Sequence, residues 1–193
     1  MTTSAASFTA LLVTSLSMSV AIAQSETSGN STSVYGLVIG GVYEIPNCPP
    51  YDGQTLGVPY TCAQTMRGNK RPFYFSAKER PSGLVPNFSS NADASITTSQ
   101  SVNGQAVISH VHFGVQIAAI QDFRKKFGEP RTFQVEKSNS YGAKWNQLTY
   151  EWKSGAAYIS AVCGFNAASQ DKCNVNVGLQ SARPGSEGGG RPL

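Results

Sequence analysis

The sequence predicts an α+β domain, in which an antiparallel β-sheet meander carries one main helix on one face. Three observations lead to this fold class. A hairpin signal at residues 103–104 separates two β-prone runs, one amphipathic helical pattern follows at residues 115–127, and four more β-prone runs come after it. The chain also has four cysteines, which we expect to form two disulfides.

The 193 residues provide one domain with tails. Residues 1–23 match a signal peptide, because an apolar stretch ends in Ala21-Ile22-Ala23, although the start of the segment lacks Lys and Arg. We expect residues 24–33 to be disordered, residues 34–181 to form the domain, and residues 182–193 to be a flexible tail. No other segment approaches transmembrane length, so the sequence predicts a periplasmic or secreted protein without stable membrane insertion.

The cysteines fit an exported protein. Cys48, Cys62, Cys163 and Cys173 can pair in three ways. A zinc site would need cysteines separated by two intervening residues, and the gaps here are far longer. An oxidising compartment favours disulfides, and we expect local pairing of Cys48 with Cys62 and of Cys163 with Cys173.

Before the helix, the strand signals vary in strength. Residues 34–45 suggest a short strand and a tight bend, and the proline-rich residues 46–86 suggest an irregular region with one short strand at 73–76. Asn-Gly between residues 95–102 and 105–113 predicts a hairpin with a type I′ turn. In the second run, alternation places Val107, Val111 and Phe113 on one face of the strand. The opposite face carries Ile108, His110 and His112.

The helix is predicted by a stripe of apolar side chains. Ile120, Phe123 and Phe127 recur at helical spacing, with Ile117 close to the same stripe. Gly128 suits the C′ position after the helix, and Pro130 prevents its continuation.

Four strands are expected after the helix, at residues 131–137, 143–152, 156–165 and 173–180. If Cys163 lies opposite Cys173 in an antiparallel pair, two further apolar pairs fall on the same face: Ala161 with Val175 and Ile159 with Val177. The register and the disulfide therefore agree.

The strand at residues 143–152 also supplies the candidate binding residues. Leu148, Tyr150 and Trp152 share the face that we expect under the helix, and the opposite face carries Trp145, Thr149 and Glu151. An exposed tryptophan on a sheet can anchor a partner. The alternative is a tryptophan buried against a loop.

His110 and His112 are the two histidines, and on a strand both point the same way. This spacing can present two ligands to zinc or copper, but a third would have to come from elsewhere, such as Asp93 or Glu151. We expect a structural or surface pair, with no metal and no other cofactor. No Gly-x-Ser-x-Gly elbow is present, and no catalytic residue is assigned.

Charge excludes one class of partner. The net charge is +4 and the basic residues are scattered, whereas nucleic-acid binding needs a stronger basic patch. We therefore expect no nucleic-acid partner.

Part of the chain resembles a known structural unit. The helix ending in Lys126-Phe127-Gly128-Glu129-Pro130 and the later Leu148-Thr149-Tyr150-Glu151-Trp152 resemble the helix-then-meander unit of small periplasmic proteins of the outer-membrane-assembly lipoprotein and β-lactamase-inhibitor-like kind. Residues 37–49 resemble uncharacterised secreted bacterial proteins that carry this unit. The chain lacks the lipidated cysteine of the lipoproteins and shows one unit where the inhibitors have two. The resemblance implies binding to proteins.

The sequence thus favours an exported, non-enzymatic protein-binding module whose partner is another exported protein. An inhibitor or an immunity-type protein acting in the periplasm is one concrete version. The alternative is a hydrolase or metal-dependent enzyme that uses the face of His110 and His112; it would need a concave polar pocket with convergent titratable groups.

Overall fold

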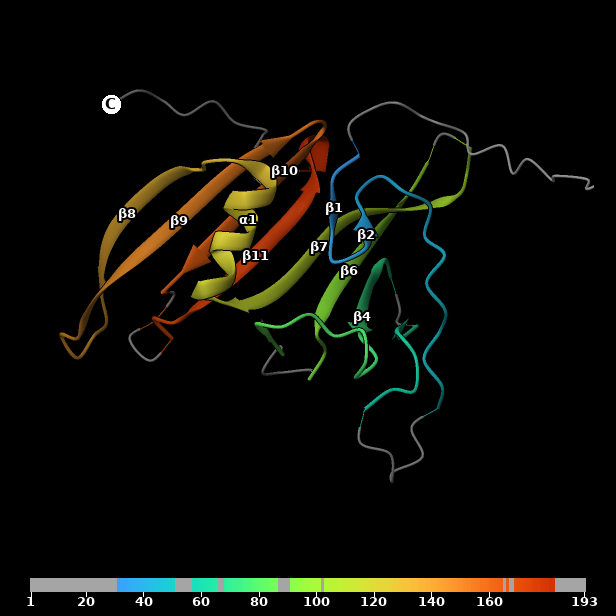
Figure 1. Cartoon of the computed structure of the whole chain (residues 1–193), viewed down its shortest axis with the longest axis horizontal. Coiled ribbons are helices and arrows are strands. Elements are labelled where there is room, and N and C mark those ends of the chain that lie inside the picture. Colours follow the sequence, from blue (N-terminus) through green and yellow to red (C-terminus); the bar gives the residue numbers. More distant parts are fainter. Residues whose placement is uncertain are drawn as a thin grey trace, which may run out of the picture.

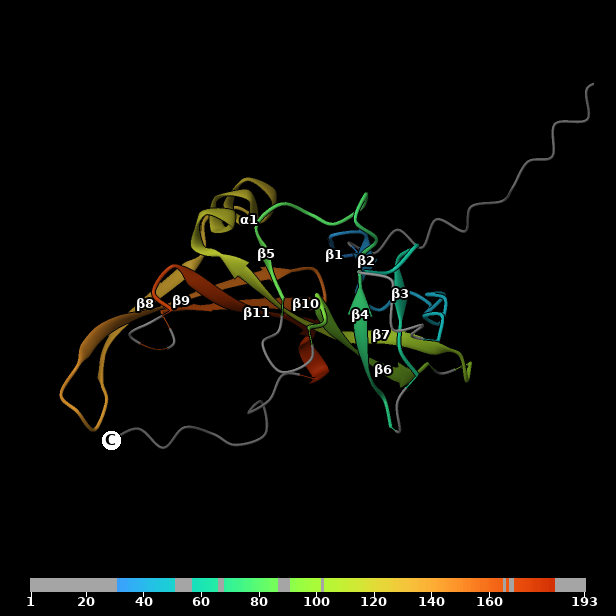
Figure 2. The same ribbon diagram turned by 90° about the horizontal axis from the view of Figure 1, so that it is seen from below.

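The computed structural model describes residues 31–50, 57–65, 68–86, 91–101, 103–164, 166 and 169–182. Over these residues the chain is mostly antiparallel β-sheet, with one short α-helix and two disulfides. The sheet is open, with β8 at one edge (Figure 1) and β3 at the other (Figure 2). The predicted signal peptide and nearly all of the predicted C-terminal tail lie outside the described residues.

The nine-stranded sheet has the order β3-β4-β6-β7-β11-β10-β9-β8, and β5 pairs with β7 next to the start of β6. Its strands are β3 (Cys62–Ala63), β4 (Lys70–Tyr74), β5 (Leu84–Val85), β6 (Ala94–Gln100), β7 (Ala106–Gln116), β8 (Arg131–Ser138), β9 (Lys144–Ser154), β10 (Ala157–Cys163) and β11 (Lys172–Leu179). The remaining elements are a separate hairpin, β1 (Ser33–Val34) with β2 (Leu37–Val38), the α-helix α1 (Ile120–Phe127), and two 3-10 turns, η1 (Ile117–Ala119) and η2 (Gln180–Ala182).

The predicted meander is confirmed, because β8, β9, β10 and β11 are consecutive antiparallel neighbours. The predicted register of the last pair is also confirmed: Cys163 lies opposite Cys173, and the two apolar pairs next to it are those expected. Both predicted disulfides are present, Cys48–Cys62 and Cys163–Cys173. Strand alternation fixed this register, since a slip by one residue would have turned the apolar set to the other face.

The hairpin between β6 and β7 forms where expected, but its predicted type I′ turn is wrong. The N–H of Gly104 donates to the carbonyl of Ser101, and the N–H of Ser101 donates to the carbonyl of Gln105. These bonds define a three-residue loop, in which Gly104 takes the positive φ (75°) after the turn.

A bulge changes the faces of β7. The register with β6 shifts between Thr97 and Thr98, so that Thr97 lies opposite His110 and Thr98 opposite Ile108. The extra residue is Ser109, whose hydroxyl donates to the Thr97 carbonyl. Ile108 is consequently buried in the core and does not share the face of the histidines, which corrects the predicted alternation.

The helix is shorter than predicted. Residues 115–116 belong to β7, because Val115 is fully buried between Leu84 and Cys173, and Ile117 is exposed in the 3-10 turn that follows. The helix ends as expected at Gly128, which has φ 82°. Phe123 is buried, whereas Phe127 is only partly buried.

Helix α1 touches the sheet through aromatic rings. Phe123 lies 5.9 Å from the ring of Trp152 on β9 and 6.3 Å from that of Phe113 on β7. The indole N–H of Trp152 donates to the carbonyl of Gly128, just after the helix (2.8 Å). Figure 2 shows α1 on one side of the sheet, with the opposite side facing away from it.

The N-terminal part of the domain begins earlier than predicted. Thr32, placed in the expected disordered segment, is buried and donates from its hydroxyl to the carbonyl of Ser154 (2.7 Å). The expected bend lies between β1 and β2, where Tyr35 and Gly36 both have positive φ. The short strand expected at 73–76 is β4, which starts earlier because residues 70–73 pair with β6.

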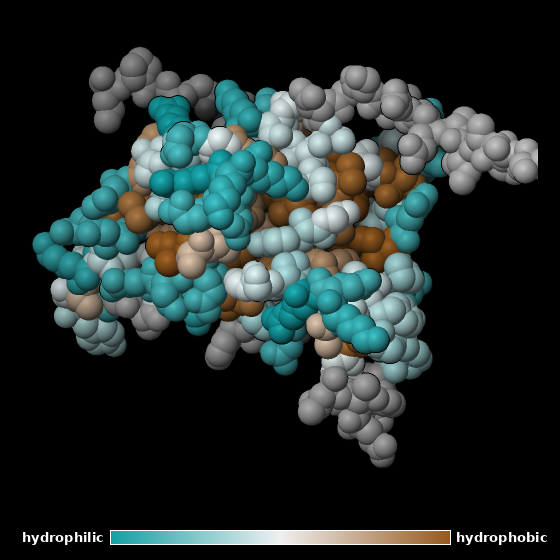
Figure 3. Space-filling view, viewed as in Figure 1, coloured by the Kyte–Doolittle hydropathy of each residue, from teal (hydrophilic) through white to brown (hydrophobic). Residues whose placement is uncertain are grey.

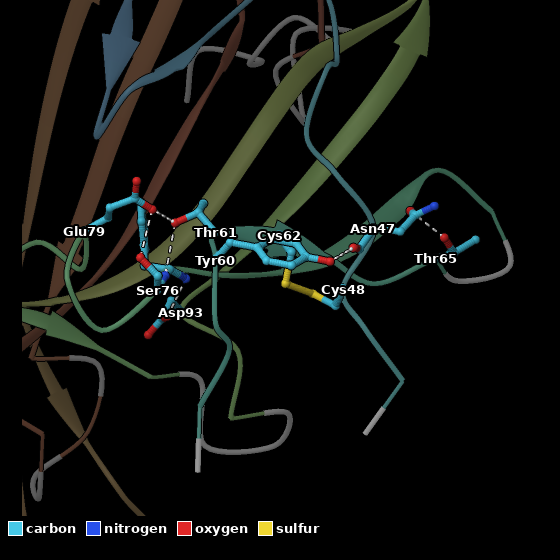
Figure 4. Close-up of a disulfide and its surroundings, with 10 residues drawn as sticks. Asn47, Cys48, Tyr60, Thr61, Cys62, Thr65, Ser76, Glu79 and Asp93 are labelled. Carbon is cyan, nitrogen blue, oxygen red and sulfur yellow. Dashed lines mark hydrogen bonds between the residues drawn. A yellow bond between two sulfur atoms is a disulfide. The ribbon is translucent and has the colours of Figure 1, made fainter. Parts of the chain in front are cut away.

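The β3 edge of the sheet is covered by the chain itself. Asn47 forms a parallel bridge with Ala63, the N–H of Cys48 donates to the Ala63 carbonyl, and the N–H of Ala63 donates to the Pro46 carbonyl. The disulfide of Cys48 with Cys62 holds this crossing in place (Figure 4). Nearby, the hydroxyls of Thr61 and Ser76 donate to the Glu79 carboxylate, and these bonds lower its pKa.

Candidate functional site

The hairpin of β8 and β9 extends away from the rest of the sheet (Figures 1 and 2). We call β8, β9 and residues 139–143 between them the arm. All eight residues of β8 are exposed, including Phe133 (38%) and Val135 (51%). Edge strands are normally shortened, covered or charged; β8 is long and carries exposed apolar side chains beside three charged residues, Arg131, Glu136 and Lys137.

The turn of the arm is well defined. The side-chain oxygen of Asn139 accepts hydrogen bonds from the N–H groups of Tyr141 and Ala143 (3.0 and 2.9 Å), and Gly142 has φ 83°. Asparagine and glycine favour such a turn, since one bonds to the nearby backbone and the other tolerates positive φ. The turn presents Tyr141, which is 94% exposed, at the tip of the arm.

The predicted binding residues all lie on one face of this arm. In the register of β8 with β9, Trp145 lies opposite Lys137, Thr149 opposite Phe133, and Glu151 opposite Arg131. We call this surface the arm face; its residues are Arg131, Phe133, Val135, Lys137, Trp145, Gln147, Thr149 and Glu151. Sequence analysis found the β9 half of the surface and missed the β8 half, which depends on a strand pairing that alternation alone does not reveal.

Two features of the arm face suit contact with a partner. The Arg131 guanidinium lies over the Phe133 ring, 4.6 Å from its centroid, so the ring is held by a cation–π contact. Trp145 is half-buried, and its indole nitrogen is buried without a hydrogen-bond partner among the described residues. The part of the Trp145 side chain that stays exposed is the part that a partner can contact.

The arm face continues across the sheet as a polar surface. One row of directly paired residues crosses from β9 to β6, and all of its members are half-buried: Glu151, Ser160, Asn176, His112 and Ser95. This row lies on the side opposite to Trp152 and Phe113, hence opposite to α1. The structure therefore places the predicted binding residues and the two histidines on the same sheet face.

The histidines lie too far from Glu151 to share a metal ion with it. Three strand spacings separate β7 from β9, about 14 Å in total. The other proposed ligand, Asp93, forms an ion pair with Arg80 (2.9 Å) and accepts the Phe75 N–H. Among the residues that the structure describes, no group of three or more His, Cys, Asp or Glu side chains is close enough to hold a metal.

Burial and positive neighbours favour the neutral form of both histidines. The pKa of His110 is lowered by burial and then by His112, against a smaller opposing effect of a hydrogen bond with Asn176. The pKa of His112 is lowered by burial and by Lys70. The ring of Tyr158 lies 6.4 Å from that of His110.

Several cavities lie along the described part of the sheet, and one of about 510 Å³ is lined by Arg131 and Glu151 of the arm face. One of about 520 Å³ lies beside His112, and its lining includes Asp93, Asn166, Lys172 and Asn174. Another of about 480 Å³ lies beside β1 and β2; its lining is mostly apolar and includes Leu37, Val42, Phe73 and Ile108. Figure 3 shows hydrophobic residues gathered around β1 and β2 on the same side of the molecule as α1.

No protein-family model, curated protein or solved structure matches the chain. Within the described part of the chain, no helix has the length and apolar character needed to cross a membrane. The two disulfides are consistent with an exported, oxidising environment.

Proposed function

We propose that this chain is an exported, non-enzymatic protein-binding module and that the arm face is its binding surface. The carrying observation is the arm itself: an exposed hairpin whose one face combines Phe133, Val135 and Trp145 with Arg131 and Lys137. Aromatic and arginine side chains contribute most of the energy at protein interfaces, and polar residues surround them.

The charge of the arm face indicates the chemistry of the partner. The arm face carries two positive side chains, Arg131 and Lys137, and one negative side chain, Glu151. The other acidic residue of the arm, Glu136, lies on the opposite face in an ion pair with Lys144 (2.9 Å). The face is therefore net positive. A partner with an acidic, partly apolar surface is complementary to it.

The predicted signal peptide and the two disulfides support placing this interaction in the periplasm or outside the cell. The resemblance to periplasmic helix-then-meander proteins, whose members bind other proteins, supports the same function. An inhibitor or immunity-type protein that neutralises an exported toxin or hydrolase is the concrete version that we propose.

Affinity capture tests this function. The mature chain, residues 24–193, is used as bait in the exported fraction of the native host, in parallel with a Trp145→Ala variant and a Lys125→Ala variant. We expect one protein to be retained by the wild type and by Lys125→Ala, and to be lost or reduced about tenfold with Trp145→Ala. Equal retention by all three baits would contradict the arm face as the binding surface.

A second candidate function is a hydrolase or metal-dependent enzyme at the cavity beside His112. The specific observation in its favour is that this cavity has a mixed polar and apolar lining, which includes the titratable residues His112, Asp93 and Lys172. It predicts that a panel of ester, peptide and glycoside substrates includes one whose hydrolysis is abolished by His112→Ala. Stoichiometric zinc or copper that is lost on replacing both histidines would also favour it.

A further inference from the structure

The two edges of the sheet end differently. The β3 edge is covered by residues 46–48 and stapled by a disulfide, whereas only β9 pairs with β8 among the described strands. An edge strand that pairs on one side leaves every second N–H and C=O pointing outward. We infer that β8 pairs antiparallel with β8 of a second copy of this chain, so that the open edges of two molecules close each other.

The sequence of β8 is complementary to itself in one register. Directly opposed residues of an antiparallel pair lie on the same face, so a symmetric pairing must be centred on a residue. Centring the ladder on Val135 pairs residues 132–138 of both copies. The opposed residues are then Val135 with itself, Phe133 with Lys137, Gln134 with Glu136, and Thr132 with Ser138.

The other registers are less favourable. Centring on Gln134 would place Arg131 opposite Lys137, and centring on Glu136 would place two carboxylates opposite each other. Like charges directly opposite are destabilising. Centring on Phe133 pairs only residues 131–135 and leaves the rest of the strand unpaired. The Val135 register is thus the longest one without directly opposed like charges.

This pairing rests on the proposed function and extends it. A two-fold axis through Val135 and perpendicular to the sheet keeps both arm faces on the same side of the combined sheet. Trp145, Thr149 and Glu151 of the two copies then flank one continuous surface with twice the binding residues. Side chains of the arm face would contact the partner, while the backbone edge joins the copies.

A single edge ladder is a small interface, so we expect a reversible dimer whose population depends on concentration. Sedimentation velocity of the wild-type chain over a concentration series measures this equilibrium. Gln134 is exposed and lies on the face away from Trp145, so its substitution leaves the arm face unchanged. In the dimer, position 134 of each copy lies opposite Glu136 of the other. Gln134→Lys would therefore create two attractive charge pairs, and Gln134→Glu two repulsive ones.

We expect Gln134→Lys to lower the dimer Kd, and Gln134→Glu to raise it, each by about two- to thirtyfold relative to the wild type. A register centred on Gln134 would instead weaken with both substitutions. In a second experiment, the Val135→Cys variant is oxidised and the disulfide-linked products are mapped. We expect a covalent dimer linked through position 135, and far less of one with Thr132→Cys.

A wild-type chain that stays monomeric at all concentrations would overturn the inference, as would equal cross-linking at both positions or the same shift from both Gln134 variants. These outcomes are separable from failure of the proposed function. A monomer that still captures a host protein in a Trp145-dependent manner refutes the dimer and leaves the binding module standing.

Discussion

Truncating Phe123 should lower the free energy of unfolding more than any substitution on the exposed side of α1. The Phe123 ring is 4% exposed and lies about equally near four other rings: Tyr35, Phe113, Phe127 and Trp152, at 5.9 to 6.3 Å. Phe123→Ala removes the one ring that touches all of them. The cavity left behind lies between the helix and the sheet.

The expected loss is about 3–5 kcal/mol, which combines the lost transfer free energy of the ring with the cost of the cavity. A domain of this size has a total free energy of unfolding of about 5–15 kcal/mol, so the loss is a large fraction of it. Lys125 on the same helix is a matched control. Its side chain is 79% exposed and its ion pair with Asp122 is a surface pair, so Lys125→Ala should cost about 0.5 kcal/mol or less.

Urea unfolding followed by tryptophan fluorescence reports the difference, because Trp152 lies beside Phe123. With an m-value of about 2 kcal/mol/M, Phe123→Ala should lower the unfolding midpoint by about 2 M. The disulfides should stay intact in non-reducing mapping. Equal and small shifts from both substitutions would show that the helix contributes little to the fold and that the α+β description fails in its main packing.

Three further variants probe the sheet. Replacing Cys163 and Cys173 together by alanine should lower the free energy of unfolding by about 2–3 kcal/mol, and an unchanged urea midpoint would contradict the role of this disulfide. Gly164→Ala should cost at least about 1 kcal/mol, because the residue has φ 65° and a Cβ would lie 2.7 Å from a carbonyl oxygen of β9; a neutral effect in thermal unfolding would refute this. Both histidines have lowered pKa values in the fold, so the unfolded chain binds more protons below about pH 6.5 and stability should fall as the pH drops through that range. The His110→Gln, His112→Gln double variant should lose less stability there, and an identical pH profile would argue against the burial effect.

Much of the sheet could be predicted because local alternation and the disulfide agree. Cys173, Val175 and Val177 alternate with polar or small residues along β11. Only one register places Cys163 opposite Cys173 and also buries the apolar side chains of both strands on the same face of the sheet. The end of the helix was also predictable, since Gly128 adopts a positive φ and Pro130 follows. These features depend on a few neighbouring residues.

The errors have a common physical origin in long-range pairing. The helical pattern in the sequence begins at Val115, but that residue belongs to β7, where it pairs with β5 on one side and β11 on the other. The bulge at Ser109 shifts the register between β6 and β7; in the sequence this serine interrupts the apolar alternation, but that irregularity alone does not specify a bulge. The same limit explains the site: Trp145, Thr149 and Glu151 were predictable as one strand face, whereas Phe133 and Arg131 joined them only through the β8–β9 register.

The central claim, that the arm face binds an exported partner, is tested most directly by site-specific photo-cross-linking. A photoreactive amino acid is placed at Thr149 on the arm face, or at Lys125 on the exposed side of α1, and each protein is irradiated in the exported fraction of the native host. We predict one strong covalent adduct with another host protein from position 149 and none of the same mass from position 125. The same adduct from both positions, or from position 125 alone, would contradict the claim.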